Sequence, residues 1–525
     1  MASRARLGER AAVASSTQRR DRSTAPRTRA LGAFVAAHEH WVAAGIFALV
    51  VLVYLWPALI EGRPLLAASG LYAQAPWSGF VPPDVAHYYN AILVDQPLSY
   101  YPWDVLSREY VRAGIFPAWN PRAFAGTPFW GNPEVAWLSP FTWPLWILPL
   151  NYALGLVAAV KLWLAGFGTY LLVRELRLGL WPGVVAGLSF MLCTFNLVWL
   201  DFGVHTQVAV MLPWAVWLVE RILRRGRWGD GLGLVAVVAL VMTGGHPGTQ
   251  LHVMTAVALY ALVRATLLRD RDRAWRVHAL VIVGAGLALG TLLAAATLLP
   301  AQQAAIDTTG AVARRNGGDE LTGARLSLAA LRAVLFPDWW GRPSEAWTRG
   351  PASYNERAYF GGVIPLLLAV AALAVRDGWR RKLPFAVVGA FGLAVGLRAP
   401  LIRAAVVHAP LFNVVQNQRL LLLFQFAVAV LSAFGLRAVL DGAAGRRRAW
   451  AALGVALVVA LVAVATLTTG RGALGKAVHY MLHRSGDVVA GVQPLASIGW
   501  MVAFALALAA LLLLAGRARW VGVAG

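Results

Sequence analysis

The stretch RELRLGLWPGVVAGLSFMLCTFNLVWLDFGVHTQVAVMLPWAVWLVERILRRGR, residues 174–227, contains the pattern that decides the fold. It starts with two arginines, passes through an apolar run, and reaches an aspartate and a histidine. A second apolar run then leads to four more arginines. Each apolar run approaches the ~20 residues that a helix needs to cross the hydrocarbon core of a bilayer. The two arginine clusters are therefore predicted on one side of a membrane, with Asp201 and His205 on the other.

The same alternation continues along the chain. Clusters of arginine and lysine occur at 174–177, 221–227, 264–276, 376–382, 446–448 and 517–519. The connections between them hold a different set of polar residues: Asp95, Asp201, His205, His246, Glu356 and Arg419. The positive-inside rule assigns short basic loops to the cytoplasm. The second set is therefore predicted on the outer face, where any polar chemistry would gather.

Composition excludes a water-soluble protein. The 525 residues are 59% hydrophobic and only 14% charged, and the mean hydropathy is +0.62. The net charge of +23 lies in short loops beside apolar runs, which favours anionic lipid headgroups over nucleic acid as the partner. The single cysteine, Cys193, lies in an apolar run, forms no internal disulfide and argues against a zinc or redox site.

These patterns predict an all-α, polytopic transmembrane protein with about twelve spans and both termini in the cytoplasm. Residues 1–40 are predicted to be a disordered, basic cytoplasmic tail, and residues 41–525 a single membrane domain. The predicted spans are Trp41–Ile60, Tyr152–Val173, Leu180–Leu200, Gln207–Leu223, Gly231–Thr243, Thr249–Leu268, Val277–Leu299, Tyr359–Val375, Leu383–Leu397, Leu420–Leu440, Ala449–Leu467 and Leu495–Ala515.

Two connections on the outer side are long, residues 61–149 and 300–358. The first is dense in tryptophan and proline. Proline inside a helix removes a hydrogen bond and clashes with the preceding turn, so one continuous helix is excluded. Short helices at the membrane surface, with tryptophan side chains at headgroup depth, are predicted instead. Loops of this length are more often functional than passive.

Within the outer connections, Asp95 lies in a loop rich in aromatic residues and proline, where a carboxylate can act as a general base or hold a metal ion. The alternative role of Asp95 is to cap a helix N-terminus. Asp201 and His205 are four residues apart, which on a continuous helix would put both on one face. A carboxylate can raise the pKa of a histidine that binds an anion or carries a proton. The alternative is two polar residues at a helix end that faces water.

Three further outer positions are candidates. His246 lies in Gly244-Gly245-His246-Pro247-Gly248, which breaks a helix and starts the next, where free N–H groups suit a phosphate. A tight turn would need only the glycines and the proline. Glu356 and Arg357 end the second long connection. Arg419 is an arginine on the side that the positive-inside rule disfavours, and a fixed guanidinium suits a phosphate. The alternative for Arg419 is a snorkelling side chain.

These stretches resemble the YfhO family of bacterial membrane proteins, which is grouped with the GT-C class of polytopic glycosyltransferases. The blocks that carry the resemblance are Asp95 with the following Tyr-Pro, Trp119-Asn120-Pro121 with Gly126-Thr127-Pro128 and Asn132-Pro133, Val198-Trp199-Leu200 through His205 to Leu212-Pro213-Trp214, Gly244 to Thr249, Asn355-Glu356 with Tyr359-Phe360-Gly361-Gly362, and Phe412-Asn413-Val414-Val415 through Arg419. The resemblance implies a plasma-membrane enzyme that transfers a sugar, on the outer face, from a polyprenyl-phosphate carrier to a cell-envelope glycan or polymer.

The resemblance also implies that Asp95 is the catalytic base, here of an inverting transfer. The other roles are hypotheses from the residues themselves. Arg419, His246 and His205 would hold the charge of the leaving phosphate. Asp201 would orient His205, and Glu356, next to Arg357, would bind a sugar hydroxyl or support a divalent metal ion.

Two other classes of protein fit the same sequence. A lipid or glycan transporter, such as a flippase, should carry charged residues near the middle of its spans. Here Lys161 is the exception in spans that are otherwise almost free of charge. This pattern favours an interfacial enzyme over a transporter. A non-catalytic membrane scaffold is the third class.

Overall fold

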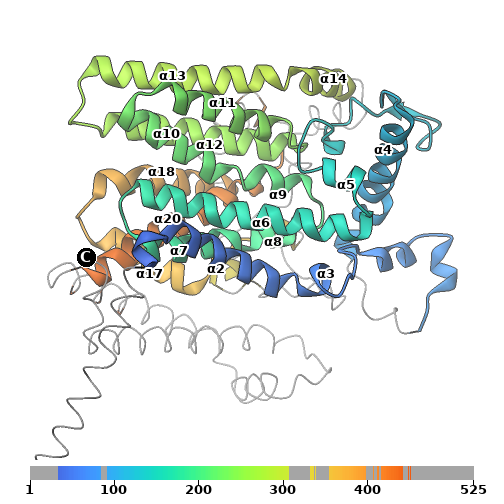
Figure 1. Ribbon diagram of the computed structural model, residues 1–525, viewed down its shortest axis with the longest axis horizontal. Helices are drawn as coiled ribbons and strands as arrows, with labels where there is room; N and C mark the ends of the chain where they lie inside the picture. The colour runs from blue at the N-terminus through green and yellow to red at the C-terminus, as the bar shows by residue number, and fades with distance from the viewer. Residues whose placement is uncertain are drawn as a thin grey trace, which may run out of the picture.

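The computed structural model describes residues 34–83, 91–306, 354–397 and 415–441, with short pieces between 332 and 454. The chain forms a bundle of helices that run side by side along one direction (Figure 1). The helices of the bundle are α2 (Glu39–Tyr54), α3 (Trp56–Leu59), α6 (Leu150–Glu175), α7 (Leu180–Met191), α8 (Thr194–Val198), α9 (Val204–Ala209), α10 (Leu212–Arg225), α11 (Trp228–Met242), α12 (Pro247–Thr266), α13 (Arg273–Leu293), α14 (Ala295–Ile306), α17 (Val363–Ala374), α18 (Trp379–Gly396) and α20 (Leu421–Leu440).

The all-α prediction is confirmed for the described part of the chain. Its only strands are the two-residue β1 (Trp119–Asn120) and β2 (Thr127–Pro128), which pair antiparallel. Among the described residues, four helical segments are long and apolar enough to cross a membrane: Leu150–Glu175, Val204–Arg225, Arg273–Leu293 and Asn417–Leu440. Ten predicted spans coincide with helices, and the last two lie almost entirely outside the described residues. The number of spans stays a prediction.

The predicted span at 180–200 is broken into two helices. The first helix of this span, α7, ends at Met191 because Cys193 is extended, and α8 follows. The chain then turns at Gly203, whose φ of +76° is a conformation that favours glycine, before α9 begins. A continuous helix, the condition for Asp201 and His205 to share a face, is therefore absent here.

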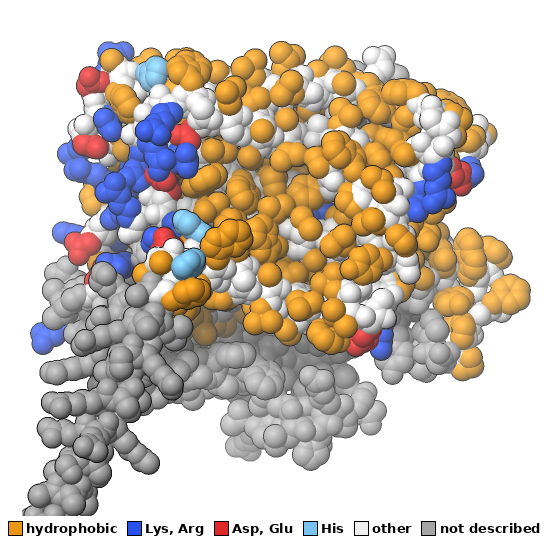
Figure 2. Space-filling view, in the orientation of Figure 1, with side chains coloured by type: hydrophobic (Ala, Val, Ile, Leu, Met, Phe, Trp, Pro, Cys, Tyr) orange, Lys and Arg blue, Asp and Glu red, His pale blue; other side chains and the backbone are white. Residues whose placement is uncertain are grey.

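The basic connections lie together at one end of the bundle. Arg224 bonds to Glu175 across two connections, at 3.0 Å. Arg271 donates to the carbonyl of Arg224 at 3.0 Å, and Arg381 donates to that of Leu176 at 2.8 Å. Lysine and arginine side chains gather at this end, called the basic end below, while apolar side chains cover the middle of the bundle (Figure 2). The predicted alternation of the connections agrees with this packing.

The first long connection forms a cap of short elements at the opposite end (Figure 1). These elements are η1 (Ala68–Ala73), η2 (Trp77–Phe80), η3 (Ala91–Val94), η4 (Gln96–Tyr100), α4 (Tyr101–Ala113), β1, β2, η5 (Pro133–Val135) and α5 (Trp143–Ile147). Leu106 and Phe129 form a small core of this cap. Within the cap, Arg108 joins α4 to α5 by donating to the carbonyl of Leu145 at 2.7 Å. Short helices are thus present where they were predicted.

The described elements of the second long connection are the end of α14, α16 (Arg332–Leu335) and η8 (Asn355–Arg357). Most of the predicted loop at 300–358 lies outside them. The turn η8 packs against η10 (Asn417–Leu420), which leads into α20. This contact brings Glu356 to Arg419.

Candidate functional site

Arg419 is the centre of a polar cluster at the capped end of the bundle. Its Nε and Nη2 atoms donate to Glu356 at 3.0 and 2.7 Å. Its Nη1 atom lies 2.9 Å from Nε2 of both His205 and His246. The guanidinium also lies over the ring of Trp199, 4.3 Å from its centroid. Four segments that are distant in sequence therefore meet at one cation.

The geometry assigns the tautomer of one of the two histidines. A guanidinium has donors only, so Nε2 of His205 accepts from Arg419, and this neutral ring carries its proton on Nδ1. For His246, Nδ1 accepts from the backbone N–H of Thr249 at 3.0 Å and lies 2.9 Å from the hydroxyl of the same residue, while Nε2 lies next to Arg419. For His205, Nδ1 is buried with no hydrogen-bond partner among the described residues. The rings stack at 3.8 Å, and His205 also stacks on Trp199 at 4.0 Å.

His246 is positioned by the turn between α11 and α12. It is the N-cap residue of α12, and Nδ1 lies 3.0 Å from the backbone nitrogen of Thr249. The preceding Gly245 has a φ of +97°, and a Cβ there would meet Val204 at 2.9 Å and the carbonyl of Pro133 at 3.0 Å. Only glycine fits this position. The expected phosphate site at this helix N-terminus is instead occupied, in part, by the imidazole of His246.

Arg419 has little capacity left for another anion. The contacts with Glu356 and the two histidines use four of its five N–H groups. Arg419 and Glu356 are 12% and 13% exposed, so the pair is largely removed from solvent. The cluster therefore holds four segments of the chain together and is not an open site for a phosphate.

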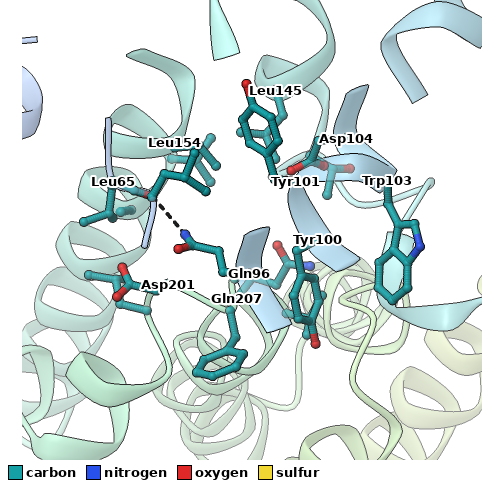
Figure 3. A pocket seen from close by; sticks show the side chains of 18 of the residues that line it. Leu65, Gln96, Tyr100, Tyr101, Trp103, Asp104, Leu145, Leu154, Asp201 and Gln207 are labelled. Carbon is teal, nitrogen blue, oxygen red and sulfur yellow. Dashed lines mark hydrogen bonds between the residues drawn. The ribbon is translucent and has the colours of Figure 1, made fainter. Parts of the chain in front are cut away.

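A cavity of about 60 Å³ lies between the bundle and the cap. Its acidic and basic lining residues are Asp104, Glu134, Lys161 and Asp201. Figure 3 shows Asp201 and Asp104 at opposite sides of the view, with Gln96 between them. Gln96 is itself fixed, since its amide donates to the carbonyl of Leu65 at 2.9 Å. The cavity is large enough to hold water or part of a polar ligand.

Burial changes the acidity of the cavity carboxylates. Removal from water disfavours the ionised form and raises the pKa of Asp104 to about 7, against the opposing effect of Lys161 and Arg108. The same cause raises the pKa of Asp201 to about 6. Both carboxyl groups therefore titrate near neutral pH, where a general acid or base works best.

Lys161 supplies the positive charge of the cavity. It projects from α6, is only 4% exposed, and donates to the carbonyl of Gly203 at 3.2 Å. This bond uses one of its three N–H groups and fastens the turn that carries Asp201. A buried ammonium of this kind needs neighbouring carboxylates, and Asp104 provides one.

Aromatic rings connect the cavity to the Arg419 cluster. Tyr100 lines the cavity and donates its hydroxyl to Glu134 at 2.9 Å. Its ring meets Phe202 edge-on at 6.1 Å, and Phe202 meets His205 in the same way at 6.1 Å. Burial raises the pKa of Tyr100, helped by the negative charges of Glu134 and Asp95 and opposed by Arg419. Tyr100 thus lies within electrostatic range of both halves of the site.

The structure distributes the predicted residues among three places. Arg419, Glu356, His205 and His246 form the cluster. Asp201 lines the cavity, so it does not orient His205 as predicted. Asp95 is exposed, makes no capping hydrogen bond, and is not among the cavity-lining residues. Arg357 is buried in η8 beside Glu356.

The donor set does not fit a metal ion. In the part of the chain that the structure describes, no group of three or more His, Cys, Asp or Glu side chains is arranged to hold one. Glu356, the predicted metal support, has its carboxylate bound by Arg419. Its oxygens are therefore engaged by a cation that the chain itself supplies.

Of the charged residues that line the cavity, Asp104, Glu134 and Lys161 were not among the site residues predicted from the sequence. Asp104 lies nine residues after Asp95 in the same connection, within the amphipathic helix α4. Lys161 was visible as a rare charge within a span, which by itself indicates a functional position. No comparable feature of the sequence pointed to Glu134.

The chain matches no family model, and no curated protein matches it.

Proposed function

We propose that the protein is a membrane glycosyltransferase of the GT-C type. It would transfer a sugar, on the extracytoplasmic face, from a polyprenyl-phosphate carrier to a cell-envelope glycan or polymer. The observation that carries the proposal is the cavity lined by Asp104, Asp201 and Lys161 beside the Arg419 cluster, at the end of the bundle opposite the basic connections. An interfacial transferase needs its polar residues at one end of its helices.

The chemistry requires one base. The acceptor hydroxyl attacks the anomeric carbon, a carboxylate takes the hydroxyl proton, and the carbon–oxygen bond to the carrier phosphate breaks with its electron pair leaving on the phosphate. A phosphate is an acceptable leaving group, so no strong general acid is needed. Lys161 adds positive charge near the reacting atoms. The Arg419 cluster serves to position the segments around them.

Two carboxylates of the first long connection compete for the role of base. The family resemblance implies Asp95, and its lack of a capping bond leaves the carboxylate available. The cavity favours Asp104, because burial has raised its pKa to about 7, close to the pH at which a base must work. Asp201, with a pKa of about 6, lies on the other side of the same cavity.

The test compares strains that carry the native protein, Asp95→Asn, Asp104→Asn or Asp201→Asn. Mass spectrometry would measure envelope sugars and polyprenyl-phosphate sugars, with membrane protein levels checked by immunoblot. Loss of one envelope sugar with accumulation of its lipid-linked precursor would identify both the activity and its base. Glu109→Gln is the matched control, since Glu109 lies on α4, as Asp104 does, and forms a solvent-exposed ion pair with Arg122. If all three variants keep native profiles at native protein levels, the proposal fails.

A further inference from the structure

The basic end of the bundle contains a second cavity, which the proposed function does not use. It is open and has a volume of about 440 Å³. Four arginines line it, together with Leu268 and Asp270: Arg177, Arg224, Arg225 and Arg271. They come from three different connections, which the bundle has brought together.

The charges of these arginines are only partly balanced. Glu175 accepts from Arg224 at 3.0 Å and from Arg225 at 2.6 Å. Counting Glu175 and Asp270 against the four arginines leaves an excess of two positive charges. The backbone carbonyl of Arg224 and the ring of Trp275 hold Arg271 in place, the ring at 4.3 Å. The guanidinium groups are thus partly preorganised around an open space.

Arg177 reaches this cavity from an unusual backbone position. It follows the C-terminus of α6 with a φ of +59°, and its N–H donates to the carbonyl of Arg174 at 2.9 Å. Glycine normally occupies this left-handed position after a helix. An arginine occupies this position although the backbone conformation disfavours it, which indicates a use for its side chain.

Exposed tryptophans indicate how deep the basic end lies relative to a lipid bilayer. Four helices begin at the basic end with an exposed tryptophan in their first turn: Trp41, Trp181, Trp228 and Trp379. Their exposed fractions lie between 45% and 78%. A ring of tryptophans at helix ends is typical of the lipid headgroup region of a membrane. The arginine cavity therefore lies at the depth of phosphates in the lipid leaflet.

We propose that this cavity binds the headgroup of an anionic phospholipid that carries two phosphates. Two phosphodiester charges would balance the two excess positive charges, and each phosphate would be bound by a pair of guanidinium groups. The lipid would fasten three cytoplasmic connections to one another.

The experiment is native mass spectrometry of the full chain, released from detergent micelles that contain cardiolipin or phosphatidylcholine. The native protein should retain cardiolipin in preference to phosphatidylcholine. Arg225→Gln and Arg177→Gly should each weaken cardiolipin binding about fivefold, as expected for one phosphate-binding arginine. Arg177→Gly removes the charge and suits the backbone conformation, so it separates loss of binding from loss of folding.

The matched control is Arg273→Gln, because Arg273 is exposed at the same end and is not a lining residue. It should bind cardiolipin like the native protein. Equal binding by Arg225→Gln, Arg177→Gly and the native protein would overturn the proposal, as would equal retention of both lipids. A separate arm adds pyrophosphate without lipid. If pyrophosphate raises the melting temperature while no lipid is retained, the ligand is a free phosphate compound and the lipid proposal is wrong.

Discussion

At the scale of single residues, the pair of Arg419 and Glu356 connects the packing of the protein with its candidate site. Both side chains are mostly buried and joined by two short hydrogen bonds. An ion pair of this kind adds little net stability over apolar residues, yet loss of one partner leaves an uncompensated buried charge. The value of the pair therefore lies in the segments that it brings together.

We therefore expect Glu356→Gln to lower the free energy of unfolding by about 3–5 kcal/mol. The cause would be an Arg419 guanidinium that stays charged and half-satisfied. Thermal unfolding in detergent would measure the effect. The double variant Glu356→Gln/Arg419→Gln should be more stable than Glu356→Gln alone, since it removes the charge as well. A double variant that is the less stable of the two would contradict this account.

Asp104 provides a prediction on pH. Its folded-state pKa of about 7 lies above the ordinary aspartate value of about 4. Protonated Asp104 is therefore favoured by the fold, and its contribution is complete below pH ~4 and lost as the pH rises through about 7. The native protein should lose on the order of 2–4 kcal/mol between pH 4 and 8 from this group. In Asp104→Asn this part of the pH dependence should be absent, as melting curves across that range would measure.

The same residue allows a test of its role in transfer. If Asp104 accepts the proton, the transfer rate should rise with pH through about 7, where its carboxylate forms. If Asp95 is the base, Asp104→Asn should keep most activity while Asp95→Asn loses it. An assay with the native protein and both variants across the same pH range distinguishes the two carboxylates.

At the scale of elements, the turn between α11 and α12 shows how one small residue positions a functional side chain. Gly245 combines a φ of +97° with backbone and side-chain neighbours at 3.0 Å or less. Gly245→Ala should cost about 2–4 kcal/mol, from backbone strain and from the shift that Val204 and Pro133 must make. It should also move His246 away from Arg419.

Gly229→Ala is the control for this prediction. Gly229 lies in the first turn of α11, and a Cβ there would meet nothing within 4 Å. Alanine should therefore be neutral or stabilising by up to about 1 kcal/mol. Equal unfolding temperatures for Gly245→Ala and Gly229→Ala would show that the close approach at Gly245 has no energetic cost.

Sequence patterns predicted helices better than they predicted where helices break. The length of the apolar runs predicted ten segments where the structure has helices, because burial in a bundle and exposure to lipid both favour apolar residues. The breaks at Cys193 and Gly203 depend on partners far away in sequence, such as the hydroxyl of Thr194 bound to the carbonyl of Phe360. The spacing of Asp201 and His205 therefore suggested a shared face that the turn between them removes.

At the scale of the whole molecule, charge placement was the most informative sequence feature. The alternation of basic and other polar connections predicted that His205, His246, Glu356 and Arg419 lie at one end, and the structure joins all four. The cavity was not predictable in the same way. Asp104 and Lys161 become neighbours only when the cap of short helices packs on α6, which no local spacing records.

The predicted orientation of the bundle in a membrane rests on the same charge placement and can be tested with cysteine labels. The native Cys193 is 1% exposed, so it should give little background. Arg112→Cys places a thiol on the exposed last turn of α4 in the cap, and Arg269→Cys places one at the exposed basic end. Positive-inside topology predicts that a membrane-impermeant maleimide labels Arg112→Cys in intact cells. It should label Arg269→Cys only after the membrane is permeabilised. The reverse result would put the Arg419 cluster and its cavity in the cytoplasm, where a lipid-linked donor on the outer face cannot reach them.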